Sequence, residues 1–120
     1  MSEAYNQATV DQLDADDDSM TIERAGKALI GAVAAPAKVV LFGSHAHGDA
    51  DDRSAFDLLV IEQDVEDRFA EMARLSTILG HMLIPAEVVV ASEEEARRRG
   101  SVKGSLIHEA MSHGRIIAES

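Results

Sequence analysis

The chain alternates between continuous apolar runs and segments in which apolar residues recur at helical spacing. Continuous runs rich in Val, Ile and Leu predict buried strands, whereas a recurrence every three or four residues predicts amphipathic helices. Four strands are expected, at 38–42, 56–62, 86–91 and 115–118. Four helices are expected, at 21–35, 65–81, 93–99 and 106–113. Ser92 with Glu95, and Ser105, supply N-terminal caps for the last two helices.

These elements follow one another in the order α-β-β-α-β-α-α-β. The segment between the first two strands, residues 43–55, lacks a helix long enough for a crossover, so these strands are expected to be antiparallel. The expected fold is α/β (α+β): a small mixed sheet of about four strands with helices mainly on one face.

Length, charge and composition limit the possible functions. The 120 residues suffice for one small domain, and we expect an acidic, mobile leader over 1–19 and a domain over 20–120. The net charge of −11 argues against direct nucleic-acid binding and against an anionic membrane surface. It suits plain solubility or docking onto a basic partner. With no cysteine and no run near the ~20 apolar residues of a membrane helix, a cytoplasmic protein without membrane contact is expected.

One acid, Asp57, interrupts the apolar strand at 56–62, and a buried carboxylate is costly unless something pairs with it. Glu87 lies near the start of the third strand. If the two strands are neighbours, these carboxylates can converge, and hard oxygen ligands of this kind select Mg²⁺. The alternative is that Glu87 simply faces solvent.

The loop after the first strand begins with Gly43 and Ser44. Glycine lets a backbone approach a ligand closely, and exposed amides with a hydroxyl can hold phosphate oxygens. A plain turn would explain the same pair. His45 and His47 follow, and contact with phosphate or plain exposure explains them better than a transition-metal site, which would need a third ligand.

The motif as a whole resembles the signature of the minimal nucleotidyltransferases (MNT), in the polymerase-β-like superfamily. That signature is Gly-Ser, ten residues, Asp-x-Asp and a third acid on a later strand. Here Gly43-Ser44 is followed by ten residues and then by Ala55-Phe56-Asp57, with Ser54 before the first acid position and Glu87 in place of the third acid. The resemblance covers about residues 22–120.

The resemblance implies an enzyme that transfers AMP from ATP·Mg²⁺ to a protein hydroxyl, an adenylylation (AMPylation). Similar proteins act as antitoxins that modify a tyrosine of a HEPN-type ribonuclease toxin, their partner. By this resemblance Gly43, Ser44 and Ser54 bind nucleotide, and Asp57 and Glu87 are catalytic and hold the metal.

Position 55 departs from the signature, because Ala55 stands where the first metal-binding aspartate belongs. The chain is therefore expected to be impaired, either as a naturally degenerate member or through a deliberate inactivating substitution. Replacement of the missing ligand by Asp49, Asp51 or Asp52 is disfavoured, because they lie on a loop. The alternative function is a catalytically dead antitoxin that neutralises its partner by docking. A transferase for small molecules is less favoured, because no second domain is present to build an acceptor pocket.

Overall fold

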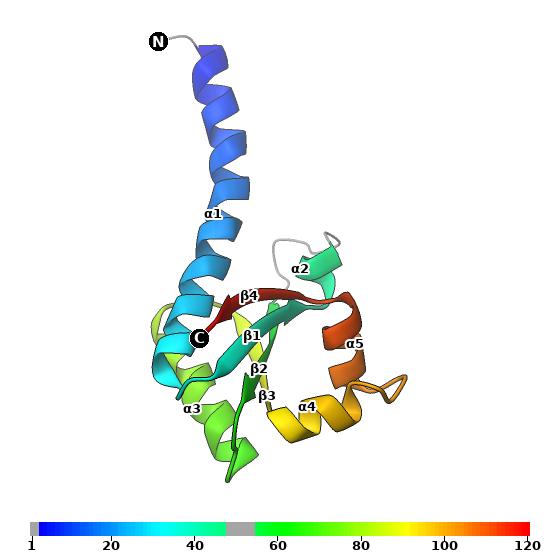
Figure 1. Ribbon diagram of the computed structural model, residues 1–120. Helices are drawn as coiled ribbons and strands as arrows, with labels where there is room; N and C mark the ends of the chain where they lie inside the picture. Colours follow the sequence, from blue (N-terminus) through cyan, green and yellow to red (C-terminus); the bar gives the residue numbers. More distant parts are fainter. Residues whose placement is uncertain (1–2, 48–54) are drawn as a thin grey trace.

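Four strands form one mixed sheet in the order β3-β2-β1-β4 (Figure 1). The computed structural model describes the backbone of residues 3–47 and 55–120, and the side chains of residues 18–46 and 55–120. The strands are β1 (Ala37–Phe42), β2 (Phe56–Glu62), β3 (Ala86–Ser92) and β4 (Arg115–Glu119). All four were predicted within one or two residues.

Strand β1 pairs antiparallel with β2 and with β4, and β2 pairs parallel with β3. The predicted antiparallel pairing of the first two strands and the mixed character of the sheet are therefore confirmed. The parallel pairing of β2 and β3 is made possible by helix α3 (Arg68–His81), which carries the chain back across the sheet. β4 is an edge strand, as predicted.

The helices differ from the prediction mainly at the beginning of the chain. They are α1 (Glu3–Ala32), α2 (Ser44–His47), α3 (Arg68–His81), α4 (Glu93–Arg99) and α5 (Leu106–His113). The predicted start of the first helix at residue 21 was wrong, since the helix begins at Glu3. The dense aspartates suggested an unfolded leader, but residues 3–20 contain no Gly or Pro to interrupt a helix. The mobility of residues 1–19 stays a prediction.

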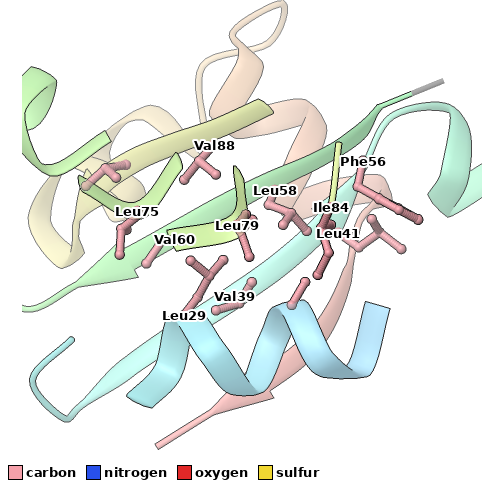
Figure 2. Close-up of a cluster of buried hydrophobic side chains, with 12 residues drawn as sticks. Leu29, Val39, Leu41, Phe56, Leu58, Val60, Leu75, Leu79, Ile84 and Val88 are labelled. Carbon is pink, nitrogen blue, oxygen red and sulfur yellow. The ribbon is translucent and has the colours of Figure 1, made fainter. Parts of the chain in front are cut away.

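One face of the sheet packs against α1 and α3. Figure 2 shows the side chains that interlock there, with Leu29 from α1, and Leu75 and Leu79 from α3, set against the strands. Leu29 and Leu75 are fully buried, and each buried side chain of this size stabilises the fold by about 1.5–3 kcal/mol. This core therefore holds the face of the sheet that carries Leu58 and Val60 against both helices.

Helices α4 and α5 pack on the opposite face. Ala96 from α4 and Ile107 and Ala110 from α5 are buried against alternate residues of β1 and β2, such as Val40 and Leu59. The expectation of helices mainly on one face was therefore wrong. The physical reason is visible in the strands, because β1 and β2 are apolar on both faces and must be covered on both.

The N-terminal caps at Ser92 and Ser105 were predicted correctly from the sequence. The Ser92 hydroxyl accepts a hydrogen bond from the Glu95 amide at 3.1 Å, and the Ser105 hydroxyl accepts one from the His108 amide at 3.0 Å. In the part of the chain that the structure describes, no helix is long and apolar enough to cross a membrane.

Glu62, at the end of β2, is a charged residue inside the core, with 8% of its surface exposed. Burial, together with a hydrogen bond and charge repulsion from Glu71, raises the pKa of Glu62 from 4.5 to about 7, although Arg74 opposes the shift. The folded protein therefore holds a proton that the unfolded chain releases. The stabilising contribution of Glu62 to the free energy of unfolding is fully present below pH 4.5 and is lost as the pH rises through about 7.

Glu62→Gln is expected to stabilise the fold above pH 7 and to leave stability at pH 4.5 almost unchanged. The amide keeps the shape of the carboxylic acid and removes the buried charge, with a gain of about 1–2 kcal/mol at pH 8 after allowance for solvent screening. Thermal unfolding at pH 4.5 and pH 8 measures the difference. Glu94→Gln, at an exposed acid of α4, is the matched control. Equal stabilisation by Glu62→Gln at pH 4.5 and pH 8 would contradict the raised pKa of Glu62.

Candidate active site

Gly43 ends β1 in a backbone conformation that favours glycine, with φ of 73°. A Cβ atom on this residue would overlap Oδ2 of Asp57, so the chain passes directly against the carboxylate. The Ala46 amide donates a hydrogen bond of 3.1 Å to the Gly43 carbonyl and closes the short helix α2, which begins at Ser44. The Gly-Ser pair therefore forms a tight turn whose backbone lies beside Asp57, and its contact with phosphate stays a prediction.

Asp57 and Glu87 face each other across the parallel strands β2 and β3. They are register partners, and a hydrogen bond joins their carboxyl groups. Asp57 lies two positions before Leu59 on β2 and therefore shares its face of the sheet. Leu59 packs toward α4 and α5, so the Asp57–Glu87 pair lies on that face. The expected convergence of the two acids is present. Glu87 is exposed as well, so its solvent contact and its pairing with Asp57 coexist.

The pKa of Asp57 is raised above its usual value of 3.8. Burial is the main cause, the charge of Glu87 and the hydrogen bond to it add to the rise, and His45 opposes it. Two adjacent carboxylates repel unless a proton or a cation lies between them. The pair therefore forms a place where a cation would replace a shared proton.

His45 is half-buried and its ring lies over Phe56, with ring centroids 4.2 Å apart. It is close enough to Asp57 to favour the charged carboxylate. His45 is therefore not simply exposed, and its contact with phosphate stays a prediction. No pattern in the sequence indicated the contact between His45 and Phe56, because the turn at Gly43 brings the two residues together.

Ala55 directly precedes β2 and is half-buried. It lies two positions before Asp57, and residues two apart in an extended segment share a face. The Phe56 amide donates a hydrogen bond of 2.9 Å to the Pro85 carbonyl, which fastens this corner to the start of β3 near Glu87. A carboxylate at position 55 would therefore join the Asp57–Glu87 pair, whereas the alanine methyl group supplies no ligand.

Several residues of the motif lie outside the described part of the chain. They are Ser54, Asp49, Asp51 and Asp52, together with the side chain of His47. The structure brings together Gly43, Ser44, Asp57 and Glu87 at one end of the sheet.

The two carboxylates fit one Mg²⁺ ion whose remaining ligands are water or substrate oxygens. Mg²⁺ is usually bound through one or two carboxylates, with water and substrate phosphates completing its shell, and Asp57 and Glu87 supply two. Within residues 18–46 and 55–120, no three acidic or histidine side chains come close enough to enclose a metal ion. The described residues thus offer an open, incomplete cation site.

Comparison with known proteins assigns the family. A family model described as Nucleotidyltransferase domain matches residues 22–113, and the chain belongs to this family. The predicted resemblance is confirmed at this level. A search of curated proteins found no match.

The fold is also found in a solved structure, the crystal structure of a toxin–antitoxin with AMP-PNP. The two chains share 20% sequence identity and superpose with a TM-score of 0.53, and the match covers 82% of this chain and 73% of that one. At this identity the likeness establishes the fold, an α/β nucleotidyltransferase-like arrangement with a mixed four-stranded sheet.

Proposed function

We propose that this chain is built as a nucleotidyltransferase that moves AMP from ATP to a protein hydroxyl with release of pyrophosphate, and that its own transfer step is impaired at Ala55. The observation that carries the proposal is the meeting of Gly43, Asp57 and Glu87 at one end of the sheet. Membership of the nucleotidyltransferase domain family supports it.

Each residue has a role in this proposal. The absence of a side chain at Gly43 lets the turn lie directly against the Asp57 carboxylate, and the backbone amides of the turn and the Ser44 hydroxyl donate hydrogen bonds to phosphate oxygens. Ser54 is proposed to act with them. Asp57 and Glu87 hold the Mg²⁺ ion that accompanies ATP. When bound, magnesium neutralises phosphate charge and activates the acceptor hydroxyl.

Ala55 weakens this site at one position. In-line displacement on a phosphate is stabilised by carboxylate-held metal ions on both the attacking and the leaving oxygens. With two acids in place of three, nucleotide can be held while the attacking hydroxyl is poorly activated. The chain is therefore proposed to bind ATP·Mg²⁺ and to transfer AMP slowly.

The proposed biological role is that of an antitoxin, with a tyrosine of a HEPN-type ribonuclease toxin as acceptor. The fold shared with a toxin–antitoxin that binds AMP-PNP supports this role. The net charge of −11 suits a basic partner.

Nucleotide binding is the first test. Calorimetric titration with AMP-PNP is expected to show saturable, Mg²⁺-dependent binding, and Asp57→Asn is expected to weaken it at least about tenfold because one of two metal ligands is lost. Glu94→Gln removes the same charge from exposed α4 and is expected to bind like the parent. Absence of Mg²⁺-dependent binding at millimolar nucleotide in all three proteins would contradict the proposal.

A second candidate function is favoured by Ala55 itself, namely neutralisation of the partner by docking alone. In that case the chain inhibits the partner's ribonuclease activity at a one-to-one ratio without ATP. Protection that strictly requires ATP and Mg²⁺ would exclude docking as the mechanism.

A further inference from the structure

A second acidic cluster lies at the other end of β2 from Asp57. Glu62 ends this strand, about 16 Å from Asp57 at the usual rise of an extended strand. A cavity of about 340 Å³ opens there between β2 and the start of α3. Its charged lining consists of Glu62, Asp64, Glu66, Asp67, Glu71 and Arg74.

Two of these acids are already occupied. Arg74 binds Glu71 in a two-point contact, with Nε and Nη2 each 2.8 Å from a carboxylate oxygen. Asp67 caps α3 by accepting a hydrogen bond of 3.1 Å from the Ala70 amide. Asp64 and Glu66 stand exposed at the rim. The cavity thus retains an excess of negative charge.

Glu62 is the acid of this cavity whose hydrogen bonding is incomplete. Glu62 lines the cavity and is more than nine-tenths buried. Its carboxyl group is joined to that of Glu71 only through a shared proton, and no N–H group donates a hydrogen bond to its Oε2 atom. A buried carboxylate oxygen without a donor costs about 1–3 kcal/mol or more. Such an atom at the bottom of an acidic cavity indicates a missing donor that enters from outside.

The geometry restricts the chemistry of that donor. Among the described side chains no three ligands converge, so a bare metal ion is poorly held. A planar guanidinium carries five N–H groups in a rigid fork that can reach separated carboxylates, and its desolvation is less costly than that of an ammonium. Arg74 on Glu71 shows that this cavity already accommodates one guanidinium–carboxylate pair.

We propose that this cavity is a docking socket for an arginine side chain on the surface of a protein partner, with the guanidinium donating to Glu62 Oε2 and to the acidic rim. The net charge of −11 favours a basic protein surface as the source of the arginine. The raised pKa of Glu62 agrees with a carboxylate that lacks its cation. The socket does not depend on the nucleotide site at the other end of β2.

The test is an NMR titration of the full chain at pH 7.5 and about 0.15 M salt, where long-range attraction is screened. The probe is N-acetyl-arginine amide, and N-acetyl-citrulline amide is its uncharged match. Saturable shifts confined to residues 62–74 are expected with the arginine compound, with at least about tenfold weaker binding of the citrulline compound.

Two variants distinguish specific arginine binding in the socket from nonspecific attraction to an acidic surface. Glu62→Gln, which retains the shape of the side chain, is expected to weaken arginine binding at least about tenfold, and Glu94→Gln is expected to bind like the parent. Equal binding by Glu62→Gln, or equal shifts with citrulline, would overturn the proposal. Methylguanidinium binding about tenfold more tightly than the blocked arginine would also overturn it, because a free guanidine would then be the ligand.

Discussion

Replacing Ala55 with aspartate is expected to raise Mg²⁺-dependent AMP transfer by about 100-fold or more. The added carboxylate would join Asp57 and Glu87 at the end of β2, and one well-placed electrostatic group is worth about 10²–10³ in rate. The assay follows label from the α-phosphate of ATP to a co-expressed partner protein. The parent and Ala55→Asp are compared at equal concentration, with and without EDTA.

Ala55→Asn is the matched control, because it adds similar volume without a charge. It is expected to transfer AMP no faster than the parent. A second readout is independent of any acceptor: a third carboxylate raises repulsion in the metal-free site, so Ala55→Asp should unfold at a lower temperature without Mg²⁺ and recover when Mg²⁺ is added. If labelling is absent and Mg²⁺ has no effect on unfolding, the proposed catalytic site is wrong. If Mg²⁺ restores the unfolding temperature but no partner protein is labelled, the metal site is supported and the proposed acceptor is wrong.

Gly43→Ala is expected to lower the free energy of unfolding by about 3 kcal/mol or more and to abolish Mg²⁺-dependent nucleotide binding. The backbone at Gly43 has φ of 73°, which costs an L-residue about 1–2 kcal/mol. The new methyl group would also meet the Asp57 carboxylate, and forcing atoms into a filled space costs about 1–3 kcal/mol. Chemical denaturation and calorimetric titration measure the two effects.

Gly104 provides the control within the same chain. Its φ is 88°, yet a Cβ there meets nothing within 4 Å, so Gly104→Ala should show the backbone cost alone. The double variant Gly43→Ala/Asp57→Ala removes the carboxylate that the methyl group meets, and a coupling energy of about 1 kcal/mol or more is expected. Equal losses in Gly43→Ala and Gly104→Ala would show that contact with Asp57 is unimportant.

The local elements of this fold could be predicted from the sequence because local signals specify them. The apolar run of β2 and the Ser92 and Ser105 caps each depend on a few neighbouring residues. The two-sided burial of β1 and β2 was also encoded, since neither strand alternates polar with apolar residues. The start of α1 was missed because charge repulsion among aspartates was weighed above the absence of helix breakers.

The candidate site could be predicted to the extent that the sequence indicated which strands are adjacent in the sheet. Asp57 stood out as an acid in an apolar strand, and its pairing with Glu87 required only that β2 and β3 be adjacent. The contact of His45 with Phe56 and the cluster around Glu62 could not be predicted, because they depend on how a turn and a helix settle on the sheet. In the sequence, Glu62 resembles an ordinary polar residue at the end of a strand. Only the structure shows that α3 lies over it.

The pairing of β4 with β1 has a consequence for synthesis on the ribosome. β2 and β3 are complete once residue 92 has emerged, so the Asp57–Glu87 pair can form early in the nascent chain. β1 then presents an open apolar edge until residues 115–119 arrive to cover it. A translational pause before Arg115 would leave that edge available to neighbouring nascent chains, and the last strand thus acts as the protein's own protection against aggregation.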